Sequence, residues 1–362
     1  MSSRLASYSM KGTVSISPPT QNPAPVSLIE LPEPIASGPS SHPRAISTAA
    51  YRTGTEAFCR SYRFPVKLST TGEVIELYGE LATSRPLNQI SSLQLLLAGG
   101  SNNGSYWDWP LDPEAHSYVR HATSQGFATL NLDRPGYGKS DRPDPMRTDF
   151  AVQGHAVNQV IEQLKASALG YRFDKVVLHG HSMGGMVAWH AASTSKIADA
   201  VIVSGVGHNL SDEAMKFVNA NAIPVEEHPR YGPGVGWKQG YFARPISAQP
   251  PTTPVDWYTC MLQDTVMSAE LAAIAPDSRN AAITMGIEVP VLFALGDKDL
   301  RWCTTTGDCR TDPAFVDEAR YYRPGLDFTS FVVPDCGHLT NKDPGAHHFF
   351  ERVTKWLRKR GF

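Results

Sequence analysis

From about residue 60 onward, the spacing of apolar and polar positions is typical of strands in some segments and of helices in others, and the two kinds of segment follow one another. Leu93–Ala98 is a continuous apolar run that ends in two glycines, as buried central strands commonly do. The expected strands are Phe64–Ser69, Val74–Leu81, Leu93–Ala98, Phe127–Leu132, Lys175–His179, Ala200–Ser204, Val289–Leu295 and Phe328–Val333. The expected helices are Glu114–Ser124, Ala151–Ala168, Met183–Ser193, Pro313–Tyr322 and Ala346–Lys359. This repetition predicts an α/β fold: an antiparallel first pair of strands, then a mostly parallel sheet with helices on both faces.

The pattern lapses between about residues 207 and 288, a stretch too long for a plain loop. Within it, Asp212–Ala222 and Asp264–Ala275 have helical patterns, and the middle is rich in proline and glycine. We therefore expect a core formed by residues 51–206 and 289–362, with residues 207–288 inserted as a cap over the functional site. The alternative is a smaller domain packed elsewhere.

Residues 1–50 are rich in proline and serine and show almost no apolar periodicity. Such a composition buries too little apolar surface to offset the loss of chain entropy. We expect a disordered or loosely draped arm.

Composition and charge exclude some classes of function. The formal net charge of -2 argues against a nucleic-acid partner, which would need a basic face. No apolar stretch approaches the length of about 18 residues that a membrane-spanning helix requires. The chain begins without the apolar core of a secretory signal, so a cytoplasmic location is expected. A small molecule is the expected partner, and nothing indicates the oligomeric state.

The five cysteines show no metal-ligand spacing, and neither a metal nor a cofactor is expected. Cys303 and Cys309 lie close enough along the chain to approach each other across a short loop. In a reducing compartment, however, free thiols are the expected state.

The motif with the clearest chemistry is Gly180-His181-Ser182-Met183-Gly184, which fits the pattern Gly-x-Ser-x-Gly. The pattern alone arises by chance, but here an apolar strand precedes it and a helix follows at once. That setting exposes the serine hydroxyl at a sharp turn beside a helix N-terminus, where a nucleophile can act. Ser182 is the predicted nucleophile.

A serine nucleophile needs a base, and the base needs an acid to orient it. Among the twelve histidines, His338 stands just past the last predicted strand, at the sheet edge that Ser182 also reaches. Gly296-Asp297-Lys298-Asp299 follows another strand and offers two carboxylates. Neither spacing nor charge separates Asp297 from Asp299.

From about residue 60 to its end the chain resembles the α/β-hydrolase superfamily, in particular its serine-nucleophile, esterase-like and lipase-like members with a cap. Besides the serine motif and His338, the segment Asp133-Arg134-Pro135-Gly136-Tyr137-Gly138-Lys139-Ser140 resembles the family's loop after the fourth strand. The resemblance implies an acid in a Gly-x-x-Asp turn, which falls on Asp299. It also implies the α/β-hydrolase fold.

The same resemblance implies an oxyanion hole made of two backbone N–H groups, one of them from Met183. The second donor should come from Gly99-Gly100-Ser101-Asn102, where many relatives carry His-Gly. Position favours Ser101, with Gly100 and Asn102 as rivals. Gly100, Asn102 and Trp107 are candidate substrate-binding residues, although Trp107 also suits a loop anchor. Cap aromatics favour an apolar or aromatic substrate: Trp237, Tyr241, Phe242, Trp257 and Tyr258.

The predicted function is that of a serine hydrolase acting on an ester, lactone or thioester through an acyl-enzyme. One alternative uses the same triad for carbon–carbon bond hydrolysis, a lyase step or a cyclisation. Others are a ligand-binding protein on this scaffold and an interaction role for residues 1–50. Haloalkane dehalogenases and epoxide hydrolases share the resemblance, but they carry an aspartate where this chain has Ser182.

Overall fold

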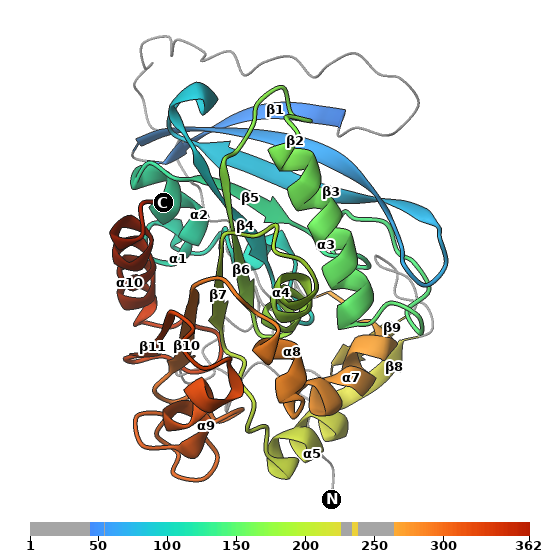
Figure 1. Cartoon of the computed structure of the whole chain (residues 1–362), viewed down its shortest axis with the longest axis vertical. Coiled ribbons are helices and arrows are strands. Elements are labelled where there is room, and N and C mark those ends of the chain that lie inside the picture. The colour runs from blue at the N-terminus through green and yellow to red at the C-terminus, as the bar shows by residue number, and fades with distance from the viewer. Residues whose placement is uncertain (1–43, 54, 226–233, 238–263) are drawn as a thin grey trace, which may run out of the picture. The chain divides into compact units, whose positions relative to one another are not determined.

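The computed structural model describes residues 44–53, 55–225, 234–237 and 264–362 (Figure 1). Within these ranges a nine-stranded sheet has the order β1-β2-β3-β5-β4-β6-β7-β10-β11. Its strands are β1 (Arg44–Thr53), β2 (Thr55–Lys67), β3 (Val74–Thr83), β4 (Ser92–Leu97), β5 (Ala128–Leu132), β6 (Lys175–His181), β7 (Ala200–Ser204), β10 (Val291–Gly296) and β11 (Phe328–Val333). Pairs from β1 to β5 are antiparallel, and all pairs from β5 onward are parallel. The predicted α/β architecture is confirmed.

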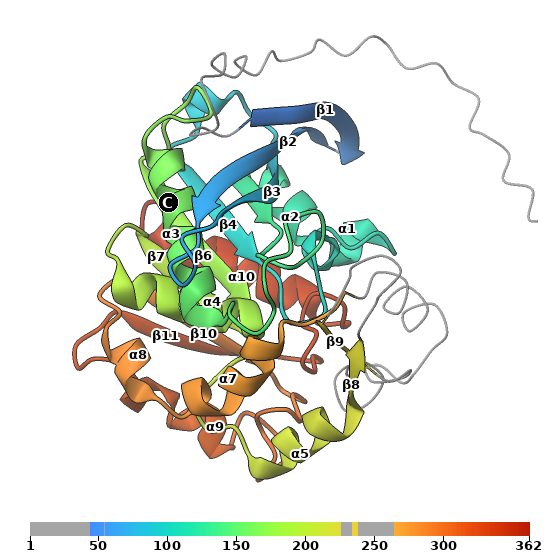
Figure 2. The same cartoon turned by 90° about the vertical axis from the view of Figure 1, so that its right-hand side faces the viewer.

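Helices cover both faces of this sheet, with α1, α2 and α10 on one side and α3, α4 and α8 on the other (Figures 1 and 2). The helices are α1 (Pro113–His116), α2 (Tyr118–Ser124), α3 (Phe150–Lys165), α4 (Met183–Thr194), α5 (Asp212–Asn221), α7 (Ser268–Ser278), α8 (Ala281–Met285), α9 (Pro313–Val316) and α10 (Ala346–Lys359). Short 3-10 turns are η1 (Leu87–Gln89), η2 (Gly104–Tyr106) and η3 (Glu318–Tyr321). Within the described ranges, none of the helices has the length and apolarity that a membrane crossing requires.

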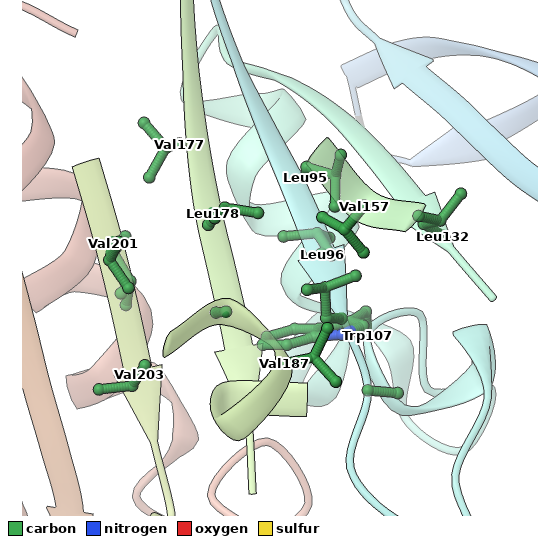
Figure 3. Close-up of a cluster of buried hydrophobic side chains, with 14 of the residues drawn as sticks. Leu95, Leu96, Trp107, Leu132, Val157, Val177, Leu178, Val187, Val201 and Val203 are labelled. Atoms are coloured by element: carbon green, nitrogen blue, oxygen red, sulfur yellow. The ribbon is translucent and has the colours of Figure 1, made fainter. Parts of the chain in front are cut away.

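Covering the sheet on both faces explains why its central strands are apolar throughout. Every residue of β4, β7 and β10 is buried, and Leu95, Leu96, Leu178 and Val201 fill the space between sheet and helices (Figure 3). Burying one such side chain stabilises the fold by about 1.5–3 kcal/mol. The resulting rigid platform fixes the ends of the strands, where the loops begin.

The segment between β7 and β10 holds α5, α7, α8 and a two-stranded antiparallel pair, β8 (Ala222–Val225) with β9 (Gly234–Trp237). The stretch predicted as an inserted cap, residues 207–288, falls within this segment, and its role as a cap stays a prediction. The aromatic residues Tyr241, Phe242, Trp257 and Tyr258, and the side chain of Trp237, lie outside what the structure describes.

The structure places a strand inside the stretch expected to be an arm. β1 starts at Arg44 and pairs with the edge of β2 as far as Thr53. An edge strand is held by backbone hydrogen bonds, so it does not need the apolar periodicity whose absence motivated the prediction. Residues 1–43 lie outside the described ranges.

Three predicted helices are interrupted or shortened in the structure. Ser117 divides the predicted helix at 114–124, because its hydroxyl accepts a hydrogen bond from the Arg120 amide and caps α2. The predicted helix from Asp264 starts only at Ser268, because Asp264 is bound to neighbouring loops. Likewise Pro313–Tyr322 forms only the short α9 and η3.

Candidate active site

Parallel strands bring the predicted chemical residues to one edge of the sheet. Ser182 directly follows β6, Asp299 lies in the loop after β10, and His338 lies in the loop after β11. Because β6, β7, β10 and β11 are neighbours and parallel, their carboxyl ends meet at this edge.

Ser182 occupies a sharp turn between β6 and α4. Its backbone has φ 52° and ψ −123°, a conformation that costs a non-glycine residue free energy and is found mainly where function requires it. The turn is possible because glycines flank it: a Cβ at Gly180 would strike the Gly184 carbonyl, and one at Gly184 would strike the Leu97 carbonyl. The Ser182 amide donates to the Ser204 carbonyl at 2.7 Å, which anchors the turn to β7.

A hydrogen-bonded chain links the three predicted residues. The Ser182 Oγ lies 3.0 Å from His338 Nε2, and His338 Nδ1 lies 3.0 Å from Asp299 Oδ2. The Asp299 side chain is fully buried, and His338 is 8% exposed. An ionised carboxylate only accepts hydrogen bonds, so it holds the proton of the imidazole on Nδ1 and leaves the Nε2 lone pair facing the serine hydroxyl.

The geometry distinguishes the two aspartates that the residues alone left open. Asp299 binds His338, and its other oxygen accepts from the Arg301 amide at 3.0 Å. Asp297 instead accepts from the Cys336 amide at 3.1 Å and ties the β10 loop to the β11 loop.

Two further histidines, His179 and His181, are buried beside the hydrogen-bonded residues Ser182 and His338. Burial, and then the neighbouring His338, hold the pKa of His181 well below its usual value. Its Nδ1 lies 3.0 Å from the Ser204 hydroxyl, and its ring stacks on Tyr106 at 4.4 Å. Burial alone lowers the pKa of His179 to about 3. Both rings are therefore neutral near pH 7 and act as packing groups in the wall behind Ser182.

The loop after β4 lies against the start of α4. Gly100, Ser101, Asn102 and Met183 line the same pocket as Ser182. A Cβ at Gly100 would collide with the Met183 sulfur, so the loop approaches this closely because glycine is there. Met183 is the first residue of α4, where backbone N–H groups have no acceptor within the helix. Ser101 has φ 60°, another unusual conformation for a non-glycine residue.

Residues far away in the sequence hold this loop in place. The Arg134 guanidinium donates to the carbonyls of Ala98 at 2.9 Å and Gly99 at 3.3 Å, and it forms a buried ion pair with Glu270 of α7. The Asp264 amide donates to the Ser101 carbonyl at 2.9 Å. Both Glu270 and Asp264 belong to the insertion, which therefore helps to set the shape of the loop after β4.

A pocket lies directly at Ser182. Its walls are mostly apolar, and α5 and α7 of the insertion contribute to them. The residues lining it besides the loop after β4 and the hydrogen-bonded chain are His181, Met183, Met186, Val206, Leu210, Met215, Val218, Ile274, Arg301, Trp302 and Leu339. Sequence reasoning missed most of these. Three of them could have been predicted from their positions. Met186 lies one helical turn after Ser182, and Arg301 and Trp302 follow shortly after the predicted acid, Asp299.

Trp107 does not line this pocket, so its candidacy as a substrate-binding residue is not supported. Its side chain is fully buried and packs against His179 at 4.6 Å and Tyr118 at 5.6 Å between ring centres. The indole therefore anchors the loop in the core (Figure 3).

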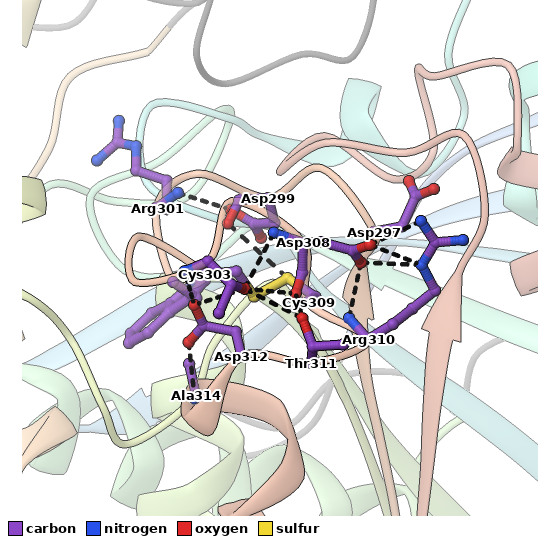
Figure 4. The surroundings of a disulfide bond; sticks show 12 residues. Asp297, Asp299, Arg301, Cys303, Asp308, Cys309, Arg310, Thr311, Asp312 and Ala314 are labelled. Atoms are coloured by element: carbon purple, nitrogen blue, oxygen red, sulfur yellow. Dashed lines mark hydrogen bonds and ion pairs between the residues drawn. A yellow bond between two sulfur atoms is a disulfide. The ribbon is translucent and has the colours of Figure 1, made fainter.

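Cys303 and Cys309 form a disulfide, so the expectation of free thiols was wrong for this pair (Figure 4). The loop after β10 folds back on itself: the Cys303 amide donates to the Asp299 carbonyl at 2.9 Å, and the Cys309 amide to the Asp297 carbonyl at 3.1 Å. The Cα atoms come within 5.1 Å, inside the range for a disulfide. Disulfides of this kind are typical of oxidising compartments. The cytoplasmic location stays a prediction.

The described residues contain no group of three or more His, Cys, Asp or Glu side chains arranged to hold a metal ion. At the edge of the sheet, the described residues offer a serine hydroxyl, an imidazole and a carboxylate in hydrogen-bond contact, beside the backbone N–H groups at the start of α4.

Comparisons with known proteins identify relatives of this chain. The model of the alpha/beta hydrolase family matches residues 94–346. The chain is 30% identical over 81 residues to the AB hydrolase superfamily protein YisY of Bacillus subtilis, a match covering 22% of this chain and 27% of that protein. It is 29% identical over 97 residues to epoxide hydrolase 3 of Xenopus tropicalis, covering 27% and 22% respectively. The matches thus span only about a quarter of these curated relatives.

Among solved structures, an esterase from Exiguobacterium antarcticum superposes with a TM-score of 0.57 at 17% identity. The superposition covers 81% of this chain and 98% of that one. At this identity the likeness bears on the fold alone.

Proposed function

Because the chain belongs to the alpha/beta hydrolase family, we propose that it is a serine hydrolase that cleaves the ester bond of a small or medium-sized apolar substrate. The single observation that carries the proposal is the chain of hydrogen bonds from Ser182 through His338 to Asp299, with both contacts at 3.0 Å. Esters, lactones and thioesters all suit this chemistry.

The reaction proceeds in two acyl-transfer steps. His338 Nε2 takes the proton of the Ser182 hydroxyl while the oxygen attacks the substrate carbonyl. His338 then passes that proton to the leaving alkoxide or thiolate, so that an acyl-enzyme and an alcohol or thiol form. Water, deprotonated by the same histidine, attacks the acyl-enzyme and releases the acid. Asp299 stabilises the imidazolium during both steps and does not itself gain the proton.

Negative charge develops on the carbonyl oxygen in each step, and two backbone N–H groups stabilise it. The donors are the amides of Met183 and Ser101. Met183 also lies at the positive end of the α4 dipole.

The apolar walls of the pocket favour an apolar acyl or alcohol group. Met186, Met215, Val218 and Ile274 surround the space in front of Ser182. Flexible methionine side chains adapt to ligands of different shape, which suits a range of chain lengths. An aspartate nucleophile, as epoxide opening in this superfamily requires, is absent from the turn, where Ser182 stands instead.

Turnover of p-nitrophenyl esters of graded acyl length, with a panel of lactones beside them, tests the proposal. The wild-type protein is expected to hydrolyse short to medium acyl chains, and Ser182→Ala should lower kcat by about 10⁴-fold or more. Ser193→Ala, in the same helix but away from the pocket, is the matched control and should keep wild-type rates. Unchanged turnover in Ser182→Ala, or no turnover of any ester or lactone by the wild type, would overturn the proposal.

A further inference from the structure

Lys342 is a buried lysine beside the loop after β4, although the mechanism above does not use it. Its exposed fraction is 2%, whereas lysines are almost never fully buried unless a partner compensates the charge. The ammonium lies 3.9 Å from the centre of the Trp109 ring and 5.7 Å from that of Tyr106. Such cation–π contacts hold a cation in place within an apolar wall.

The Lys342 ammonium also donates to the Asn102 side chain, with its Nζ 3.2 Å from Asn102 Oδ1. An ammonium has donors only, so Asn102 must turn its oxygen toward Lys342 and its NH₂ group away from it. That NH₂ group donates to the Gly100 carbonyl at 3.0 Å. When Lys342 is charged, the orientation of the Asn102 amide is thus fixed by its two contacts.

The Gly100 carbonyl belongs to the same peptide unit as the Ser101 N–H. A trans peptide is planar, and its C=O and N–H point in opposite directions. Holding the Gly100 carbonyl therefore fixes the direction of the Ser101 N–H, which is the second oxyanion donor of the proposed mechanism. A second contact steadies the next peptide unit, because the Asp264 amide donates to the Ser101 carbonyl.

Lys342 reaches Asn102 from the turn that begins at the proposed base, His338. Within this turn the Lys342 amide donates to the Leu339 carbonyl at 2.8 Å, and the Asp343 carboxylate accepts from the Gly337 amide at 2.6 Å. The turn from His338 to Asp343 therefore carries both the proposed base, His338, and the lysine that contacts the loop after β4.

We propose that Lys342 is a positioning residue: through Asn102 it fixes the Gly100–Ser101 peptide with its N–H directed at the oxyanion. The inference rests on the proposed hydrolase function. Lys342 acts through Asn102 and touches no reacting atom. Burial lowers the pKa of Lys342 to about 7, against the opposing effect of the neighbouring Asp343 carboxylate. The amine form can also accept hydrogen bonds, so the charged form holds the amide more strictly.

The test compares kcat and KM of Lys342→Met with those of the wild type, using a p-nitrophenyl ester that the wild type turns over. Loss of one oxyanion donor costs about 10²–10³-fold in kcat. Because the peptide in Lys342→Met still visits the active orientation, we expect a smaller loss of about tenfold or more, with KM little changed. Lys355→Met is the matched control, since Lys355 is an exposed lysine of α10, and it should keep wild-type constants.

Asn102→Asp provides a second variant that does not depend on the stability of Lys342→Met. The aspartate keeps an acceptor for Lys342 but replaces the donor to the Gly100 carbonyl with a repelling oxygen. Its kcat should fall at least as far as that of Lys342→Met. The double variant should lose no more than the worse single variant, because both changes act through one peptide unit.

A crystal structure of each variant supplies a readout besides activity, and the Gly100 carbonyl is expected to leave its wild-type direction. A folded Lys342→Met with wild-type kcat and an unmoved peptide would overturn the inference, as would losses that multiply in the double variant. The two failures are distinguishable: if the wild type turns over no ester, the proposed function fails. If the wild type is active, Ser182→Ala is not, and Lys342→Met equals the wild type, only the positioning role fails.

Discussion

Two loops meet at Ser182, and they are held in different ways. The loop after β10 is held largely by contacts within itself: Asp299 accepts from the amides of Arg301 and Cys303, and the disulfide closes the same loop. Asp297 adds a tie from outside, because its carboxylate accepts from the Cys336 amide of the loop after β11. The loop after β4 is held from a distance, because Arg134 lies 35 positions from Gly99, and Lys342 lies 240 positions from Asn102. The first loop therefore carries much of its own support, whereas the second depends on residues from the loops after β5 and β11.

Because of this difference, we expect that substituting a residue far from Ser182 alters the site mainly by shifting the loop after β4. The two loops also differ in what they supply. The loop after β10 carries Asp299, whose carboxylate contacts His338. The loop after β4 is instead held by Arg134, Asp264 and Lys342, which contact its backbone carbonyls and the Asn102 side chain.

The largest expected effect lies in the local loop. Asp299→Asn should lower kcat for ester hydrolysis by about 10⁴-fold, because the asparagine NH₂ group favours the wrong tautomer of His338. Asp297→Asn is the matched control and should stay within about threefold, since its amide oxygen still accepts from the Cys336 amide. Steady-state kinetics on both variants checks this. Equal losses would leave the acid unassigned and break the distinction drawn from the geometry.

The next effect concerns the distant support. Glu270→Ala leaves the buried Arg134 charge without its carboxylate, and both side chains of this pair are at most 1% exposed. Removing one partner of a buried pair costs about 3–5 kcal/mol, so the free energy of unfolding measured in urea should fall by about that amount.

The control for this change is Glu351→Ala, which breaks an exposed pair with Lys355 on α10 and should cost less than about 1 kcal/mol. If both variants lost the same stability, the buried pair between α7 and the loop after β5 would contribute no more than an exposed pair, and it would not count as a support for the loop after β4.

The smallest effect belongs to the disulfide. Replacing Cys303 and Cys309 together with serine removes a constraint on a short loop, so the free energy of unfolding should fall by roughly 2 kcal/mol. Adding a reductant to the wild type should produce the same loss, whereas the double serine variant should not respond to it. A wild-type protein indifferent to reductant would show that the bond contributes nothing to this loop.

The sequence predicted the local features because adjacent residues determine them. Gly180, Ser182 and Gly184 indicate a sharp turn, and the apolar runs before and after it indicate strand and helix. Ser182, Asp299 and His338 each follow a predicted parallel strand, and the carboxyl ends of such strands share one edge of a sheet. The pattern of strands was therefore enough to place Ser182, His338 and an aspartate at that edge, whereas the choice of Asp299 over Asp297 came from the family resemblance.

Other features could not be predicted because they depend on side chains that meet only after folding. Nothing in the pattern around Lys342 reveals that its ammonium reaches Asn102. Nothing around Asp264 shows that its amide binds Ser101 and thereby delays the start of α7. β1 was missed for a related reason, since an edge strand depends on backbone pairing and not on the apolar pattern of its own residues. Residue type left Trp107 open between the pocket and a loop anchor, and its packing against His179 and Tyr118 shows the anchor.

The most direct test of the central claim is covalent labelling with a fluorophosphonate, followed by peptide mass spectrometry. The account predicts one adduct, on Ser182, formed rapidly by the wild type and absent from Ser182→Ala. An unlabelled wild-type protein, or an adduct that persists at full yield in Ser182→Ala, would contradict the claim that Ser182 is the activated nucleophile of a serine hydrolase.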